Sequence, residues 1–366
     1  MPNQNPQQSP SSYNAINGST TVGTRRDARY EKRTHLWSLT SLPRVHKCGK
    51  TPVGPVQIAV QDGIAFTRNL ATCGSVWVCP VCSAKILAKR QVEIAEVIDR
   101  WNELKGFFIF QTITIPHPKG AGVATQRLML KTAWDSINKG RFSTLNKTYG
   151  QEGYLKVTEC TYSDSGFHLH IHVIRFTKRF LGADEVAEWG EALFSQMSRA
   201  LTNKGYRAPS RKAQDFRQVE ITEDWSGYFT KSFDNGSEAA ASTSPATYPN
   251  TVWSLLDRVI AEPNDEQKRL WHDYEKGTFR LNQLTWSKHL RKNLGLTEPT
   301  SDEDVANTED TVTEVLLEIE PSDVNLFVQL GRLLSQVLRH VSQGGLEDAL
   351  AILNEHGIRY TLLCSP

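Results

Sequence analysis

The middle of the chain carries short apolar runs of the kind that form β-strands. Phe107–Ile115 is rich in aromatic and β-branched residues and is followed directly by Pro116, which favours a central strand that ends there. A polar turn at Tyr162–Gly166 separates two further runs and predicts a hairpin. The four strands are expected at Phe107–Ile115, Gly153–Thr161, His168–Phe176 and Gln218–Thr222.

Apolar residues spaced three or four apart predict helices around these strands. They are expected at about Ser83–Lys105, Thr125–Ile137, Ala183–Leu201 and Asp224–Phe233, then in the region Thr251–Leu294 and in two amphipathic runs within Glu314–Glu355. The order strand, helix, hairpin, helix, strand, helix favours an α+β fold over a doubly wound parallel sheet. We therefore expect a central antiparallel β-sheet with flanking helices, a small Cys-bearing segment before it and a helical C-terminal region after it.

Shifts in composition divide the 366 residues into seven segments. Polar residues dominate the N-terminus and the connections, which favours disorder in the former and loops in the latter. The expected segments are a disordered tail (1–30), a Cys-rich zinc-binding segment with its helix (31–105), the sheet core (106–233), a linker (234–250), a helical extension of the core (251–295), an acidic linker (296–313) and a C-terminal helical segment (314–366).

The net charge of +2 conceals a basic body and an acidic C-terminal segment. Leu296–Pro366 holds 3 of the 42 Lys and Arg and 13 of the 40 Asp and Glu, a net charge of −10, which leaves +12 for the rest. A basic body indicates a polyanionic partner. An ordinary solvated surface would explain the same charges, so charge alone does not decide.

The cysteines point to a bound metal. The chain has no apolar run of about 18 residues and no apolar signal segment, so we expect a cytoplasmic protein without a membrane-spanning helix. In that reducing compartment, metal binding is a better interpretation than disulfides. Cys79-x-x-Cys82 has the knuckle spacing of structural zinc, and Cys48 and Cys73 complete a tetrahedral set, with His46 as an alternative to one thiol.

Three histidines alternate with apolar residues in the third expected strand. Because successive side chains of a strand point to opposite faces, His168, His170 and His172 share one face. Two His and a carboxylate suit a divalent metal that also binds a phosphate. Glu159, on the preceding strand, is expected near His170 or His172 across the hairpin. A His-rich solvent face and a surface carboxylate are the plain alternatives.

A tyrosine lies in the helix expected after the sheet. Tyr228 and Lys231 are three residues apart on one helical face, and Asp224 lies one turn earlier. A tyrosine oxygen can attack phosphorus and form a covalent phosphotyrosine if a cation such as Lys231 or a metal lowers its pKa from about 10. Asp224 or Glu223 could activate water or a hydroxyl. On its own, such a segment more often packs its ring and solvates its amine.

Taken together and in this order, the motifs resemble the plasmid rolling-circle replication initiators, or Rep proteins, a branch of the HUH endonucleases. The matching stretches are Gln111–His117, Glu159-x-Thr161 with Gly166–His172, Tyr228–Lys231, the cluster ending Cys79-Pro-x-Cys82, Leu270–Glu275 and Leu284–Arg291. The resemblance spans about Arg44 to Leu296. The acidic C-terminal segment has no counterpart in it.

The resemblance implies an HUH/RRM-like palm as the nuclease core. In it, His170 and His172 would bind the metal, Glu159 would be the third ligand and His168 an additional histidine of this branch. Tyr228 would be the single nucleophile, as in initiators that have one catalytic Tyr.

The acid that precedes the nucleophile departs from the family pattern. The position four residues before the Tyr is Asp224, where the family more often has Glu. Since Glu223 is adjacent, either acid could serve.

The function implied is metal-dependent nicking and strand transfer on single-stranded or cruciform origin DNA through a 5′-phosphotyrosine. The implied cofactors are Mg or Mn at the catalytic site and Zn at the cysteines, and the implied partners are a host polymerase and helicase, with no membrane. The alternatives are a non-catalytic zinc-containing DNA-binding protein, or another HUH enzyme such as a relaxase or single-strand transposase. His before Tyr, with an early Cys knuckle, argues against the latter two. No motif reports the origin sequence, the oligomeric state or the role of the acidic segment.

Overall fold

The computed structural model describes residues 19–220, 251–308 and 314–363. The described residues fall into two compact units, one of residues 19–83, 302–308 and 314–363 and one of residues 84–220 and 251–301. The helix expected at Asp224–Phe233 lies outside the described residues. Within the ranges described, no helix is both long and apolar enough to cross a membrane.

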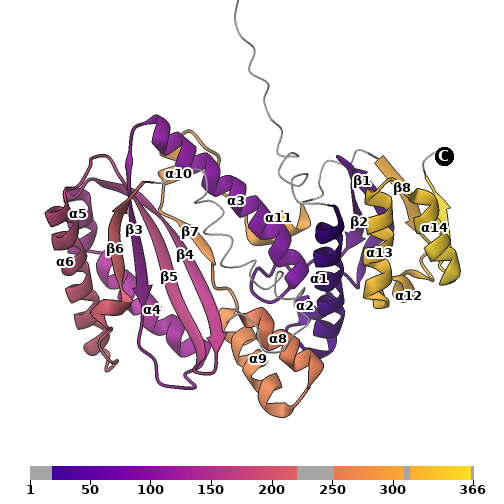
Figure 1. The fold of residues 1–366 in the computed structure, drawn as a ribbon, viewed down its shortest axis with the longest axis horizontal. Helices are drawn as coiled ribbons and strands as arrows, with labels where there is room; N and C mark the ends of the chain where they lie inside the picture. The colour runs from indigo at the N-terminus through magenta and orange to yellow at the C-terminus, as the bar shows by residue number, and fades with distance from the viewer. Residues whose placement is uncertain (1–18, 221–250, 309–313, 364–366) are drawn as a thin grey trace, which may run out of the picture. The chain divides into compact units, whose positions relative to one another are not determined.

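The second unit is built on an antiparallel five-stranded sheet with the order β6-β3-β5-β4-β7. Figure 1 shows β5 between β3 and β4 in its centre. The strands are β3 (Phe107–Thr114), β4 (Gln151–Ser163), β5 (Gly166–Thr177), β6 (Asp215–Val219) and β7 (Leu284–Trp286). The predicted hairpin and central strand are therefore present. β7 was not predicted, and it corrects the expectation of continuous helix over Thr251–Leu294, because Leu284–Trp286 pairs with β4.

Helices cover the sheet on both faces (Figure 1). On one face α3 packs Ile94, Val97, Ile98 and Trp101 against strand residues that include Phe110 and Phe176. On the opposite face Trp134 of α4 contacts Tyr154, with ring centroids 4.9 Å apart, and Trp189 of α6 contacts Phe216 at 5.1 Å. The helices are α3 (Pro80–Glu103), α4 (Val123–Asn138), α5 (Arg141–Thr148), α6 (Ala183–Thr202), α8 (Val252–Ala261), α9 (Asp265–Thr278) and α10 (Leu290–Asn293). The α+β class with a central antiparallel sheet is thus confirmed.

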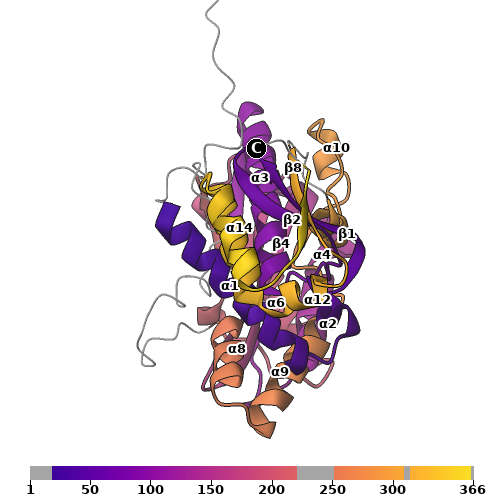
Figure 2. The same ribbon diagram turned by 90° about the vertical axis from the view of Figure 1, so that its right-hand side faces the viewer.

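The first unit joins residues from near both ends of the chain in a second antiparallel sheet, ordered β2-β1-β8-β9. In Figures 1 and 2, α13 and α14 lie beside this sheet. Its elements are β1 (Pro52–Gln61), β2 (Ile64–Leu70), β8 (Glu314–Ile319), β9 (Tyr360–Leu362), α1 (Ser19–Leu39), α2 (Pro43–Lys47), α11 (Asp302–Asn307), α12 (Val324–Gln329), α13 (Gly331–Ser342) and α14 (Leu346–Glu355). Ile58, Leu317, Phe327 and Leu338 are among the residues of its core.

Two expectations about the first unit were wrong. Residues 314–319 are a strand and not the start of a helix, because β8 pairs with β1 and buries Leu317 in the shared core. Residues 19–30, expected in a disordered tail, belong to α1. This helix is tied to the core by Tyr30, and Asp27 forms an ion pair with Arg339 of α13.

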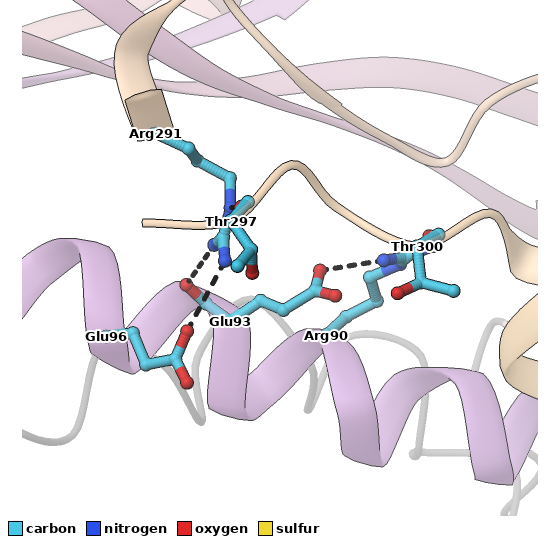
Figure 3. Close-up of polar contacts among 6 residues, drawn as sticks. All are labelled: Arg90, Glu93, Glu96, Arg291, Thr297 and Thr300. Carbon is cyan, nitrogen blue, oxygen red and sulfur yellow. Dashed lines mark hydrogen bonds and ion pairs between the residues drawn. The ribbon is translucent and has the colours of Figure 1, made fainter. Parts of the chain in front are cut away.

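A polar cluster in the second unit, with Arg90, Glu93 and Arg291 buried, fastens the segment after α10 to α3 (Figure 3). Its residues are Arg90, Glu93, Glu96, Arg291, Thr297 and Thr300. Arg90 forms an ion pair with Glu93 at 2.7 Å, with only 8% and 3% of the two side chains exposed, and also donates to the carbonyl of Thr300. Arg291 donates to the carbonyls of Glu93 and Thr297. Since the partners are 195–210 residues apart in sequence, the cluster closes this unit at long range.

Arg90→Met is expected to destabilise the second unit by about 3–5 kcal/mol, because it leaves the buried Glu93 carboxylate without its cation. Arg90→Met with Glu93→Leu should recover most of that loss. The matched control is Arg100→Met, which breaks an exposed pair with Glu103 at the same spacing on the same helix and should cost at most about 1 kcal/mol. Urea unfolding followed by circular dichroism measures all three. Equal losses for Arg90→Met and Arg100→Met would contradict a role for burial.

Candidate metal centres

The histidine strand alternates as its sequence predicts. The side chains of Leu169, Ile171 and Val173 on β5 are buried, whereas the intervening His side chains lie on the other face and are half-buried. β5 pairs with β4 and β3 on its two sides, so this face is held by neighbours at both edges. The expected sharing of one face by the three imidazoles is confirmed by this pairing.

Two of these histidines converge on one carboxylate. The β4–β5 register places Glu159 directly opposite His170. Oε2 of Glu159 lies 2.7 Å from Nε2 of His170 and 3.1 Å from Nε2 of His172. The three side chains offer two nitrogens and one oxygen within 4.8 Å of one another. Such a set can hold a divalent cation and leaves further coordination positions open to another ligand.

Neighbouring residues fix the orientation of His172. Oγ1 of Thr112 on β3 lies 3.2 Å from Nδ1 of His172, and the ring of Phe110 stacks on the imidazole with centroids 5.8 Å apart. Because Nδ1 is engaged by Thr112, Nε2 is turned towards Glu159. Partners of this kind set the tautomer and orientation of metal-binding histidines. Since Phe110 also packs under α3, the apolar core supports this imidazole directly.

The carboxylate between the two imidazoles is held in its charged form. Burial raises the pKa of Glu159, but hydrogen bonds to His170 and His172 outweigh burial and hold the pKa at about 2. Glu159 is therefore an anion at neutral pH. A buried anion with two nitrogen ligands beside it is a suitable donor set for a cation.

The structure does not bring His168 into this group. Nδ1 of His168 lies 2.8 Å from Nε2 of His117, and its Nε2 lies 3.3 Å from Oγ of Ser163. Burial, followed by the charges of His117 and His170, lowers the pKa of His168. His117 was part of the Gln111–His117 stretch, but the pattern of that stretch did not show that it would meet His168.

The candidate catalytic residues Tyr228, Lys231, Asp224 and Glu223 lie outside the described residues. The distance from the Tyr228 phenol to the Glu159 group is therefore untested, and the roles given to these residues stay predictions.

The four predicted cysteines converge in the first unit. Sγ of Cys48 lies 3.7 Å from that of Cys79 and 3.5 Å from that of Cys82, and Sγ of Cys73 lies 3.7 Å from that of Cys82. Four thiolates around zinc at about 2.3 Å would lie about 3.8 Å apart, so the spacing suits a tetrahedral metal and is too long for a disulfide.

Local backbone geometry explains this convergence. Cys48 and Cys73 are each followed by a glycine in the left-handed region, Gly49 at φ 65° and Gly74 at φ 59°, which lets each chain segment turn sharply after its thiol. Pro80, between the other two cysteines, is the first residue of α3, where a missing N–H costs nothing. His46 does not join the group of four thiols: it is exposed, and its Nδ1 lies 2.7 Å from the carbonyl oxygen of Trp37.

Known proteins share sequence with this chain. It is 25% identical over 310 residues to "Protein rep" of Streptomyces lividans, a match that covers 66% of this chain and 68% of that protein. The predicted resemblance to Rep proteins is confirmed. The chain is also 27% identical over 191 residues to "Neomycin resistance protein" of Streptomyces cyanogenus, with 40% of this chain and 44% of that protein covered. No family model and no solved structure matches this chain.

Glu159→Gln is expected to weaken Mn²⁺ binding at least about tenfold, because the amide removes the only negative charge of the group and even outer partners act on this scale. Isothermal titration calorimetry on the full chain measures it. The control is Glu152→Gln on the same strand, whose carboxylate pairs with Lys178 in a more exposed position. Unchanged Mn²⁺ affinity in Glu159→Gln would contradict the assignment of this metal centre.

Proposed function

We propose that this protein initiates rolling-circle replication of a plasmid by nicking and rejoining single-stranded or cruciform origin DNA. The observation that carries the proposal is the Glu159–His170–His172 group on the central strands of an antiparallel sheet. Similarity to a protein named Protein rep supports it. A DNA-binding protein without catalysis would have no use for a preformed cation site with open positions.

The chain's own residues would bind the substrate at this face. Glu159, His170 and His172 would hold Mg²⁺ or Mn²⁺, which supplies a positive charge that polarises the scissile phosphate. Cζ of Arg217 on β6 lies 5.6 Å from the centre of the Phe110 ring, and Phe110 stacks on His172. Its half-exposed guanidinium is suited to position a DNA phosphate beside the group, although it also pairs with Asp215.

Tyr228 would perform the covalent step. Its phenolic oxygen loses a proton and forms a bond to phosphorus, while the bond from phosphorus to the 3′ oxygen breaks. The 3′ oxygen takes up a proton, so the products are a 5′-phosphotyrosine and a 3′ hydroxyl that can prime a host polymerase behind a host helicase. Lys231 would balance the charge of the phosphate, and Asp224 or Glu223 would take the proton from a later attacking hydroxyl or water.

The structural cysteines would have a separate task. Cys48, Cys73, Cys79 and Cys82 would bind Zn²⁺ with four protein ligands and no open position, which is the pattern of a structural site. The two centres therefore divide the metal requirements of the protein between folding and catalysis.

Tyr228→Phe is expected to abolish the covalent adduct, since phenylalanine has no attacking oxygen, and to leave Mn²⁺ affinity unchanged. Labelled single strands from the encoding replicon, incubated with the full chain and run on denaturing gels, report nicking and linkage together. Tyr206→Phe, in a described loop of the second unit, is the control and should retain both. A wild-type level of adduct in Tyr228→Phe would show that another residue is the nucleophile.

Removal of divalent metal distinguishes metal-dependent nicking from DNA binding without catalysis. EDTA should stop nicking, and Mg²⁺ or Mn²⁺ added back should restore it, because the bound divalent cation would polarise the scissile phosphate. Nicking that persists in EDTA, or DNA binding without any nicking under every metal, would overturn the proposal.

A further inference from the structure

Arg33 on α1 is a buried cation without an acidic partner. Only 5% of this residue is exposed, and its Nε makes no hydrogen bond. Within the described parts of the chain, no carboxylate pairs with it. A buried charge is costly unless an opposite charge or well-placed acceptors compensate for it. Something near Arg33 must therefore supply negative charge.

The other buried arginines of the described chain all have oxygen partners. Arg90 has the carboxylate of Glu93, and Arg291 donates to the carbonyls of Glu93 and Thr297. Arg175 donates to the side-chain oxygens of Gln111, Asn138 and Gln151. Arg33 differs from these three because its neighbours are the Tyr30 ring and the cysteine cluster.

Arg33 lies against the Cys48 corner of that cluster. A Cβ built on Gly49 would stand 2.1 Å from Nη1 of Arg33, so the guanidinium occupies the space that only a glycine leaves open. Arg33 interacts electrostatically with Cys48, Cys79 and Cys82, and its Cζ lies 4.5 Å from the centre of the Tyr30 ring. Gly49 thus serves both the left-handed turn after Cys48 and the approach of this cation.

Opposite charges would explain why Arg33 lies beside the four-cysteine cluster. Four neutral thiols would leave Arg33 uncompensated, whereas four thiolates around Zn²⁺ carry a net charge of −2, which is itself costly to bury. The positive charge of Arg33 and the negative charge of the zinc–thiolate group would then compensate each other, which would explain why both can be buried. We propose that Arg33 is the outer-sphere counter-ion of the Cys48–Cys73–Cys79–Cys82 centre and that its positive charge strengthens zinc binding. This inference rests on the zinc assignment of the cluster and is independent of the nicking reaction.

The test compares Arg33→Gln with Arg33→Lys in the full chain. Both keep a long polar side chain, but only lysine keeps the charge. Zinc per chain is measured by mass spectrometry of the metal after dialysis, and zinc affinity by competition with a chromogenic chelator. Arg33→Gln should bind zinc about 10–100-fold more weakly, as loss of outer-shell partners does elsewhere, and Arg33→Lys should stay close to wild type. The control is Arg339→Gln, which breaks the Arg339–Asp27 pair of α1 away from the thiols and should leave zinc affinity unchanged.

The outcomes distinguish failure of the zinc assignment from failure of the role proposed for Arg33. Wild-type protein without zinc would overturn the zinc assignment and this inference with it. Zinc in the wild type, with equal affinity in Arg33→Gln, would overturn the role of Arg33 alone. Equal losses in Arg33→Gln and Arg339→Gln would reduce that role to stabilising α1 and also overturn it.

A folding defect in Arg33→Gln is also informative. Because a ligand of the folded state stabilises it by mass action, excess zinc should restore the thermal midpoint of Arg33→Gln if the lost charge acts through zinc. A variant that stays unfolded at saturating zinc would show that Arg33 has a general structural role, contrary to the proposal.

Discussion

The antiparallel pairing of β4 with β5 is the constraint on which the candidate catalytic centre depends. Its register sets Glu159 opposite His170, and the period of two along each strand keeps His172 on the same face. A slip of β4 by one residue would turn Glu159 to the opposite face and bring Thr158 or Cys160 beside His170. The buried Leu155 and Val157 of β4 oppose that slip, because it would remove them from the core that they share with α3.

Residues around the β4–β5 pair support the side chains of the candidate centre. α3 covers the apolar part of the same sheet face and packs on Phe110, and Phe110 supports His172. The buried Arg90–Glu93 pair and Arg291 fasten a distant segment on α3. The apolar core is thus in direct contact with the candidate metal-binding histidines.

The first unit has a smaller sheet and contains the four-cysteine cluster. A small sheet made from residues near both ends of the chain has a modest core, and the four cysteines bring together α2, the segment after β2 and the start of α3. On the proposal above, zinc would cross-link these segments and Arg33 would offset the negative charge of the four thiolates. In both units a buried ionic group is placed against a partner far away in sequence, which favours one arrangement of the chain over others.

Local sequence patterns determined much of this protein. The alternation around His168–His172, the Cys79-x-x-Cys82 spacing and the strand of Phe107–Ile115 each depend on neighbours within a few residues, and each was predicted correctly. Only the tertiary structure decided that β8 joins β1, that Leu284–Trp286 is a strand, that His168 meets His117 and that Arg33 lies beside the thiols. These contacts join segments that are far apart in sequence, and the packing free energy of the whole core decides which of them pair. The local spacing of apolar residues therefore does not predict these contacts.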